Sequence, residues 1–132
     1  MPREVNVKKV LHNLQKLPLN VRIMTPNAVK KEGFEEKLVP LTIAQAILDA
    51  VLGDYADDKP NAATRLRRFS IAQKCQDALD TEGDEVIVSF TLLEIEMVKT
   101  LVAKAYTTLV TGLLWAEIDP EGLEKTLAGG DE

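Results

Sequence analysis

The sequence has few of the residues on which most catalytic and metal-binding sites depend. It contains one cysteine and one histidine, which excludes an internal disulfide and a multi-cysteine metal site. Only 5% of its residues are aromatic, so its core must be built from aliphatic side chains. His12 and Cys75 could meet in space, but no third group that would orient such a pair can be named. We therefore expect a protein that is not an enzyme and needs no metal or cofactor.

Long apolar runs and a strong positive charge are also absent. No segment offers the roughly 20 uninterrupted apolar residues of a membrane span, and no apolar signal region follows the N-terminus. The net charge of −5 disfavours broad binding to nucleic acids or anionic membranes. Hydrophobic residues make up 45% of the 132 residues, as in an ordinary globular domain. These features predict one domain over residues 1–132, located in the cytoplasm, with a frayed tail at 128–132.

The sequence does contain helices with clear start signals. Thr42 precedes Gln45 by three residues, the spacing of a capping box, and Gly53 occupies the place of a left-handed C-terminal cap. Asn61 can cap a further helix that runs to Leu79. Residues at spacings of three and four should face inward in these two helices: Ile43, Ala46, Ile47, Ala50 and Val51 in the first, and Leu66, Phe69, Ala72, Cys75 and Leu79 in the second.

The most apolar stretch, residues 91–118, predicts one long central helix. Thr91 and Glu94 repeat the capping-box spacing, and Asp119-Pro120 ends the helix. Because its circumference is apolar nearly all round, other chain must cover it. A narrow polar stripe marks the one face expected to see water: Glu96, Thr100, Lys104, Thr107 and Thr111, flanked by Lys99 and Thr108.

Extended segments are few and short. Val5 and Val7 alternate as in a strand, but Asn6 could cap a helix, and the apolar spacing favours a helix over residues 7–14. Residues 21–24 and 34–39 predict an antiparallel hairpin joined by a polar connection at 27–33. Residues 85–90 could add a strand to it or be an extended linker, and 121–127 could form one helical turn. The expected fold is mainly helical α+β, with the hairpin packed on three or four helices.

The apolar surplus of the long helix suggests protein binding. It could be plain core, or an interface through which the chain self-associates as a homo-oligomer. In the second case the anchoring side chains would be Met97, Tyr106, Leu113 and Trp115. The leading hypothesis is a non-enzymatic protein-interaction module.

A basic cluster supports a second hypothesis. Arg65, Arg67, Arg68 and Lys74 could contact the phosphates of a nucleic acid. The same residues could equally form a solvated face that offsets Asp54, Asp57 and Asp58. Those three acids lack the glycine and final glutamate of a calcium-binding loop, so we expect no metal there.

Two motifs carry a resemblance to known proteins. One is Arg68, Phe69, Ala72 and Lys74, in the pattern R-F-x-x-A-x-K, and the other combines Lys104, Tyr106, Leu109, Val110 and Gly112, in the pattern K-x-Y-x-x-L-V-x-G. With the segments before them, they resemble small proteins of tailed bacteriophages and prophages. The resemblance implies a phage-encoded protein acting in the host cytoplasm on a host or virion-assembly protein. It assigns no activity and no functional residue.

Overall fold

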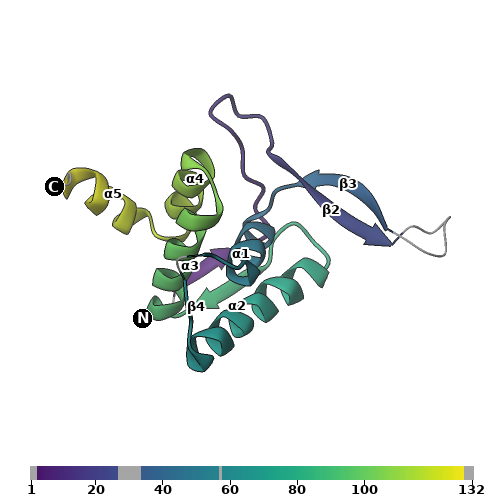
Figure 1. The fold of residues 1–132 in the computed structure, drawn as a ribbon. Helices are drawn as coiled ribbons and strands as arrows, with labels where there is room; N and C mark the ends of the chain where they lie inside the picture. Colours follow the sequence, from purple (N-terminus) through teal and green to yellow (C-terminus); the bar gives the residue numbers. More distant parts are fainter. Residues whose placement is uncertain (1–2, 27–33, 57, 130–132) are drawn as a thin grey trace.

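The computed structural model describes residues 3–26, 34–56 and 58–129, and within them it shows a mainly helical α+β fold (Figure 1). The expected fold class is confirmed. Two separate two-stranded antiparallel sheets accompany the helices. In chain order the elements are β1 (Arg3–Asn6), β2 (Asn20–Pro26), β3 (Phe34–Pro40), α1 (Ile43–Leu52), α2 (Ala62–Asp80), β4 (Ile87–Phe90), α3 (Leu92–Ala105), α4 (Thr108–Ile118) and α5 (Pro120–Gly129).

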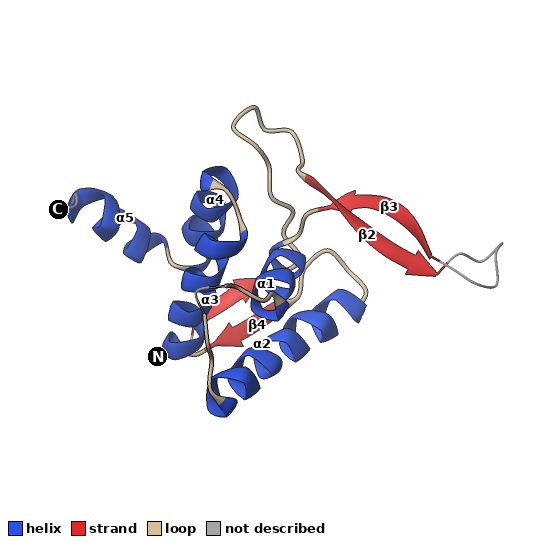
Figure 2. Ribbon diagram, viewed as in Figure 1, coloured by secondary structure: helices blue, strands red, loops and turns tan. Residues whose placement is uncertain are grey.

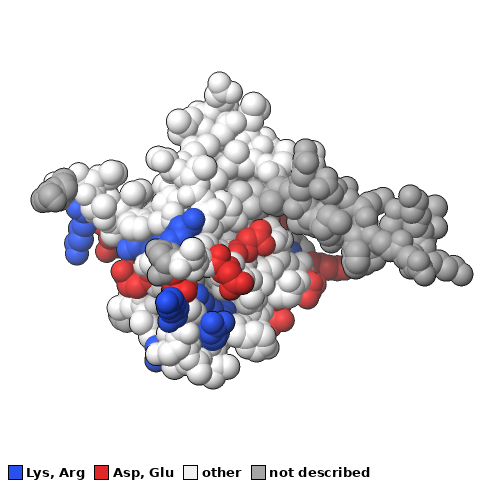
Figure 3. Space-filling model, in the orientation of Figure 1, with Lys and Arg blue, Asp and Glu red and all other residues white. Residues whose placement is uncertain are grey.

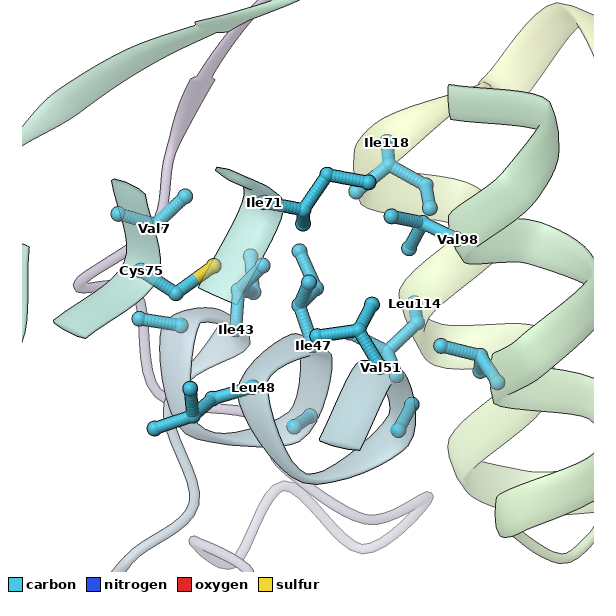
Figure 4. Close-up of a cluster of buried hydrophobic side chains, with 14 of the residues drawn as sticks. Val7, Ile43, Ile47, Leu48, Val51, Ile71, Cys75, Val98, Leu114 and Ile118 are labelled. Carbon is cyan, nitrogen blue, oxygen red and sulfur yellow. The ribbon is translucent and has the colours of Figure 1, made fainter. Parts of the chain in front are cut away.

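Helix α1 lies at the centre of the core. The stripe predicted for it is fully buried, and Ala44 and Leu48 are buried as well. Figure 4 shows Ile47 and Val51 of α1 beside Val98 of α3 and Leu114 of α4. The Thr42 hydroxyl accepts the N–H of Gln45, which confirms the N-terminal cap. The Gln45 side chain donates to Asp49, so the second bond of the expected capping box is not formed. The core is therefore arranged around α1 and not around the long helix expected over residues 91–118.

The prediction of one helix over residues 91–118 is wrong, because the chain breaks between α3 and α4. Two consecutive residues are extended there: Tyr106, with φ −124° and ψ 164°, and Thr107, with φ −74° and ψ 176°. Tyrosine and threonine are weak helix formers, and the Tyr106 hydroxyl donates to the Ala46 carbonyl of α1 at 3.3 Å. The bend returns Leu114 and Ile118 to the core, which a straight helix of about 40 Å would overrun.

The prediction of a helix over residues 7–14 is also wrong. This segment has no regular helix: residues 7–8 form a turn, and Val10 and His12 make isolated bridges. Its backbone bonds distant parts of the chain, because the Val7 N–H donates to the Val86 carbonyl and the Leu11 N–H to that of Leu41. Asn6 does not cap a helix, because its side-chain oxygen accepts the N–H groups of Lys8 and Val86. The alternation of Val5 and Val7, both buried, was the correct signal for β1.

The hairpin and the strand after α2 belong to different sheets. β2 pairs with β3 from Asn20 opposite Pro40 to Pro26 opposite Phe34, which confirms the predicted hairpin. Its connection at 27–33 lies outside the described residues. Figure 2 shows the hairpin extending away from the helices, so its expected packing on them is wrong, and the sheet that packs on the helices is the one formed by β1 and β4. β4 pairs with β1 and not with the hairpin, placing Arg3 opposite Phe90.

Helix α2 begins at the Asn61 cap as predicted. Its predicted inward face is correct in the second half of the helix, where Ala72 and Cys75 are buried and Leu79 packs against the core, and wrong in the first half. Leu66 and Phe69 are 67% and 55% exposed, whereas Ile71, Ala72, Cys75 and Ala78 are buried. The inward position one turn before Ile71 belongs to Arg68, a charged residue that hid the true stripe. Gly53 is likewise no left-handed cap, since its φ is −73°.

The C-terminal boundaries follow the sequence signals more closely. Both capping-box hydrogen bonds between Thr91 and Glu94 are present, which confirms the start of α3. Asp119-Pro120 ends α4 as expected, and the turn predicted over 121–127 is part of the longer helix α5. Residues 128 and 129 belong to this helix, and the rest of the expected frayed tail lies outside the described residues.

Candidate functional site

A groove of about 400 Å³ lies where α3 ends and α4 and α5 face each other. Within the described part of the chain, its lining holds no acidic, basic or thiol side chain. Two aromatic rings, three threonines and three small or aliphatic residues line it: Tyr106, Trp115, Thr108, Thr111, Thr126, Ala103, Gly112 and Leu123. Such a surface can hold apolar side chains and bond a few polar groups.

The break between α3 and α4 positions Tyr106 at one end of the groove. Its hydroxyl is held by the Ala46 carbonyl, and burial raises the pKa of the phenol far above its ordinary value. The hydroxyl of Tyr106 is therefore used within the fold, as a donor to α1. Gly112 leaves space in the groove lining, because apart from its chain neighbours and the backbone of its own helix no atom lies within 4 Å of where a Cβ would be.

The ring of Trp115 packs against the ammonium group of a buried lysine, Lys99. Lys99 Nζ lies 4.5 Å from the centre of the indole ring, in cation–π geometry. The same ammonium donates to Asp119 at 2.8 Å and to Glu96 at 3.1 Å. Lys99 was expected beside the solvent-facing stripe, but it is only 8% exposed. Three partners replace the water that this lysine loses.

The charges of this cluster are mutually stabilised. The hydrogen bond from Lys99 holds the pKa of Asp119 below its ordinary value. Burial would lower the pKa of Lys99, but its hydrogen bonds to Asp119 and Glu96 outweigh burial and raise it. The second oxygen of Asp119 accepts the N–H of Gly122 at 3.1 Å, as a helix N-cap does. One carboxylate thus starts α5 and ties it to α3.

The structure brings together two of the four residues predicted as interface anchors. Tyr106 and Trp115 share the groove, whereas Met97 lines a different hollow with Arg68 and Lys104. Leu113 is half-buried against the core. The groove residues from α5 were missed because they lie beyond the long helix. Gly112, a glycine inside a helical pattern, was the available signal.

The predicted basic patch is divided. Arg68 lies 2.7 Å from Asp58, and Lys74 lies 2.9 Å from Glu94. Arg65 and Arg67 are exposed, but two residues apart on a helix they point in different directions. Half of the patch is thus paired with acids of the same chain. Binding of a nucleic acid at this helix stays a prediction.

The remaining candidates do not form a site. Cys75 is fully buried, and desolvation raises the pKa of its thiol to about 12. His12 is exposed, with Nδ1 3.1 Å from the Val10 carbonyl. The structure does not bring the two together. Of the three acids at 54, 57 and 58, the middle one lies outside the described residues, and Asp58 faces Arg68.

Comparisons with protein-family models, with curated protein sequences and with solved structures found no match. Among the described residues, no helix combines the length and apolar character that crossing a bilayer requires.

Proposed function

We propose that this chain is a non-enzymatic protein-interaction module that receives the apolar side chains of a partner protein in the groove between α3, α4 and α5. The observation that carries the proposal is that Tyr106 and Trp115 line one groove together with hydroxyl and aliphatic groups. Tyrosine and tryptophan often dominate binding energy at interfaces, because each offers a large and rigid apolar area.

The groove suits binding better than chemistry. General acid–base or nucleophilic catalysis needs a group that ionises near neutral pH or is activated by a neighbour. Tyr106 is the ionisable side chain among the lining residues, and burial shifts its pKa upward. The partner would be a host or virion-assembly protein, in keeping with the resemblance to phage proteins. A cytoplasmic location and self-association of the chain are parts of the same proposal.

The test fills the groove without removing any native contact. A Gly112→Leu substitution places a side chain where a Cβ meets no neighbouring atom, so the fold should persist while the groove is blocked. Proteins captured from a bacterial lysate by the wild-type chain would be identified, purified and titrated by calorimetry against both forms. We expect affinity to fall at least about tenfold, as for loss of a central contact at an interface.

A matched control places the same side chain elsewhere. Thr100→Leu adds an apolar group on the exposed side of α3, outside the groove lining, and should leave the affinity unchanged. Circular dichroism would confirm that both variants are folded. Equal binding of wild type and Gly112→Leu would show that the groove is not the binding surface.

A further inference from the structure

Charge is segregated along α2 and the residues that flank it. Residues 59–74 contain five lysines and arginines and no acid, whereas residues 75–85 contain five acids and no lysine or arginine. A helix dipole favours the opposite order, with acids in the first turn and bases in the last, and α2 has neither. Bases at the start of α2 and acids at its end interact unfavourably with the helix dipole and so lower the stability of the single chain. A contact with another molecule is the better explanation for this arrangement.

Part of the basic half is already used inside the chain, and the rest faces outward. Arg68 and Lys74 face Asp58 and Glu94, but Arg65 is exposed, and so is Asp80 at the other end of the helix. Figure 1 shows α2 on the outside of the fold. On the face drawn in Figure 3, acidic side chains lie toward the end of α2 and basic ones toward its beginning.

Five side chains on the exposed face of α2 form a row that is complementary to its own reverse. Its members recur at spacings of four and three, lie within about 80° of the helix circumference at 3.6 residues per turn, and are all exposed: Arg65, Phe69, Gln73, Gln76 and Asp80. The cation and the acid stand at equal distances from the middle of the row, as do Phe69 and Gln76. When two copies of this row lie antiparallel, Arg65 of each copy is therefore opposite Asp80 of the other.

We infer that this face is the self-association surface of the chain, on which a second copy docks with its α2 antiparallel to the first. A two-fold axis near Gln73 would bring Arg65 against the partner's Asp80, and the symmetry makes this pair twice. Phe69 would cover the aliphatic part of the partner's Gln76. The two helix dipoles would also be opposed, so each basic half would lie beside an acidic one.

The surroundings of Phe69 leave room for such a neighbour. Arg65 and Phe69 line a hollow of about 330 Å³ between the end of α1 and the start of α2, together with Leu52 and Pro60. Leu52 is 60% exposed, which extends the apolar area next to Phe69. Contact over about 22 Å of helix is shorter than a standard interface provides. We therefore expect a weak, reversible and salt-sensitive dimer.

The inference names the surface for the self-association part of the proposed function and rests on that part. The experiment uses charge reversal in the full chain. With Arg65→Glu alone, an acid at position 65 would face Asp80 of the other copy at both ends of the dimer interface. With Asp80→Arg alone, an arginine at position 80 would face Arg65 of the other copy at both ends. Sedimentation velocity at protein concentrations up to about 1 mM should show the wild type dimerising and each single variant weakened about tenfold or more.

Mixing provides the specific signature. In a 1:1 mixture of Arg65→Glu and Asp80→Arg chains, both ends of a mixed dimer pair opposite charges, so dimerisation should return. The double variant should also dimerise. Arg67→Glu carries the same charge change on the other flank of α2 and should behave as the wild type.

Two results would overturn the inference, and they differ in what else they affect. A monomeric wild type at the highest concentration would remove both this surface and self-association, while leaving binding at the groove untouched. A dimer that responds equally to Arg65→Glu and Arg67→Glu, or a mixture no more associated than its components, would remove the α2 surface only.

Discussion

Two glycines of the C-terminal helices show how much a single Cβ decides. At Gly122 an added Cβ would overlap the Asp119 carboxylate and lie 2.9 Å from Lys99 Nζ. At Gly112 the same atom would meet nothing within 4 Å. The first glycine is needed for the close approach of α5 to the buried lysine, whereas the second leaves an open space in the groove.

A Gly122→Ala substitution should therefore destabilise the fold. The methyl group would push Asp119 away from Lys99 and leave a charge that is only 8% exposed without its closest partner. We expect a loss of about 1–3 kcal/mol in the free energy of unfolding, measured by urea denaturation. Gly112→Ala is the matched control and should stabilise the chain by about 0.5–1 kcal/mol through helix propensity. Similar effects of the two substitutions would contradict the role given to Gly122.

At the scale of elements, helix starts could be predicted from the sequence but helix orientation and continuity could not. Thr42, Asn61 and Thr91 cap helices as expected, because a cap is a local hydrogen bond between residues three apart. The break at Tyr106 depends on a contact with Ala46, 60 residues away, which periodicity does not report. The first half of the inward face of α2 was missed because a paired arginine, Arg68, occupies a core-facing position.

The capping bonds lead to a test of their own. Thr91 takes part in both hydrogen bonds of the capping box of α3, whereas Thr107, in front of α4, makes no side-chain cap bond. Thr91→Ala should lower the free energy of unfolding by about 1 kcal/mol, and Thr107→Ala should change it by no more than about 0.5 kcal/mol. Thermal and urea denaturation would measure both. The reverse order would mean that tertiary contacts, and not the caps, fix these helix starts.

The groove itself was only half visible in the sequence. Tyr106 and Trp115 could be selected because aromatic residues are rare in this chain and common in interfaces. Their meeting requires the bend between α3 and α4, and the remaining wall comes from α5, which the sequence predicted as a single turn. The site is a product of how the last three helices are angled, and a pattern within one helix carries no information about that angle.

At the scale of the whole molecule, three ion pairs tie the helices together. Asp58 meets Arg68 of α2, Glu94 joins α3 to Lys74 of α2, and Asp119 joins the start of α5 to Lys99 of α3. The Arg68 guanidinium lowers the pKa of Asp58. Burial would raise the pKa of Glu94, but hydrogen bonds from Lys74 and Thr91 outweigh it and leave the pKa lowered. All three carboxyls are thus more acidic in the folded chain.

Stability should consequently be lost in acid. The unfolded chain takes up protons near the ordinary values, 3.8 for aspartate and 4.5 for glutamate, while the folded chain takes them up only at lower pH. The contribution of these groups is complete above about pH 5 and disappears as the pH falls through the lower, folded pKa values. Urea denaturation from pH 7 down to pH 3 would measure this loss.

Asp119→Asn should make the acid loss shallower, because it removes one of the carboxyls with a lowered pKa. Asp54→Asn removes an exposed carboxylate and serves as the control, with the acid transition of the wild type expected to remain. A steeper loss in the Asp119→Asn variant, or none in the wild type, would contradict this account.

The pairing of β1 with β4 has a consequence for the order in which the chain can fold. Arg3 lies opposite Phe90 and Asn6 opposite Ile87, so the first strand completes its hydrogen bonds only after α1 and α2 have been made. During synthesis the residues of β1 leave the ribosome long before those of β4 and must wait unpaired. Closing so long a loop is entropically slow. We expect the first strand to be the last to dock, so that it closes over a helical core that is already formed.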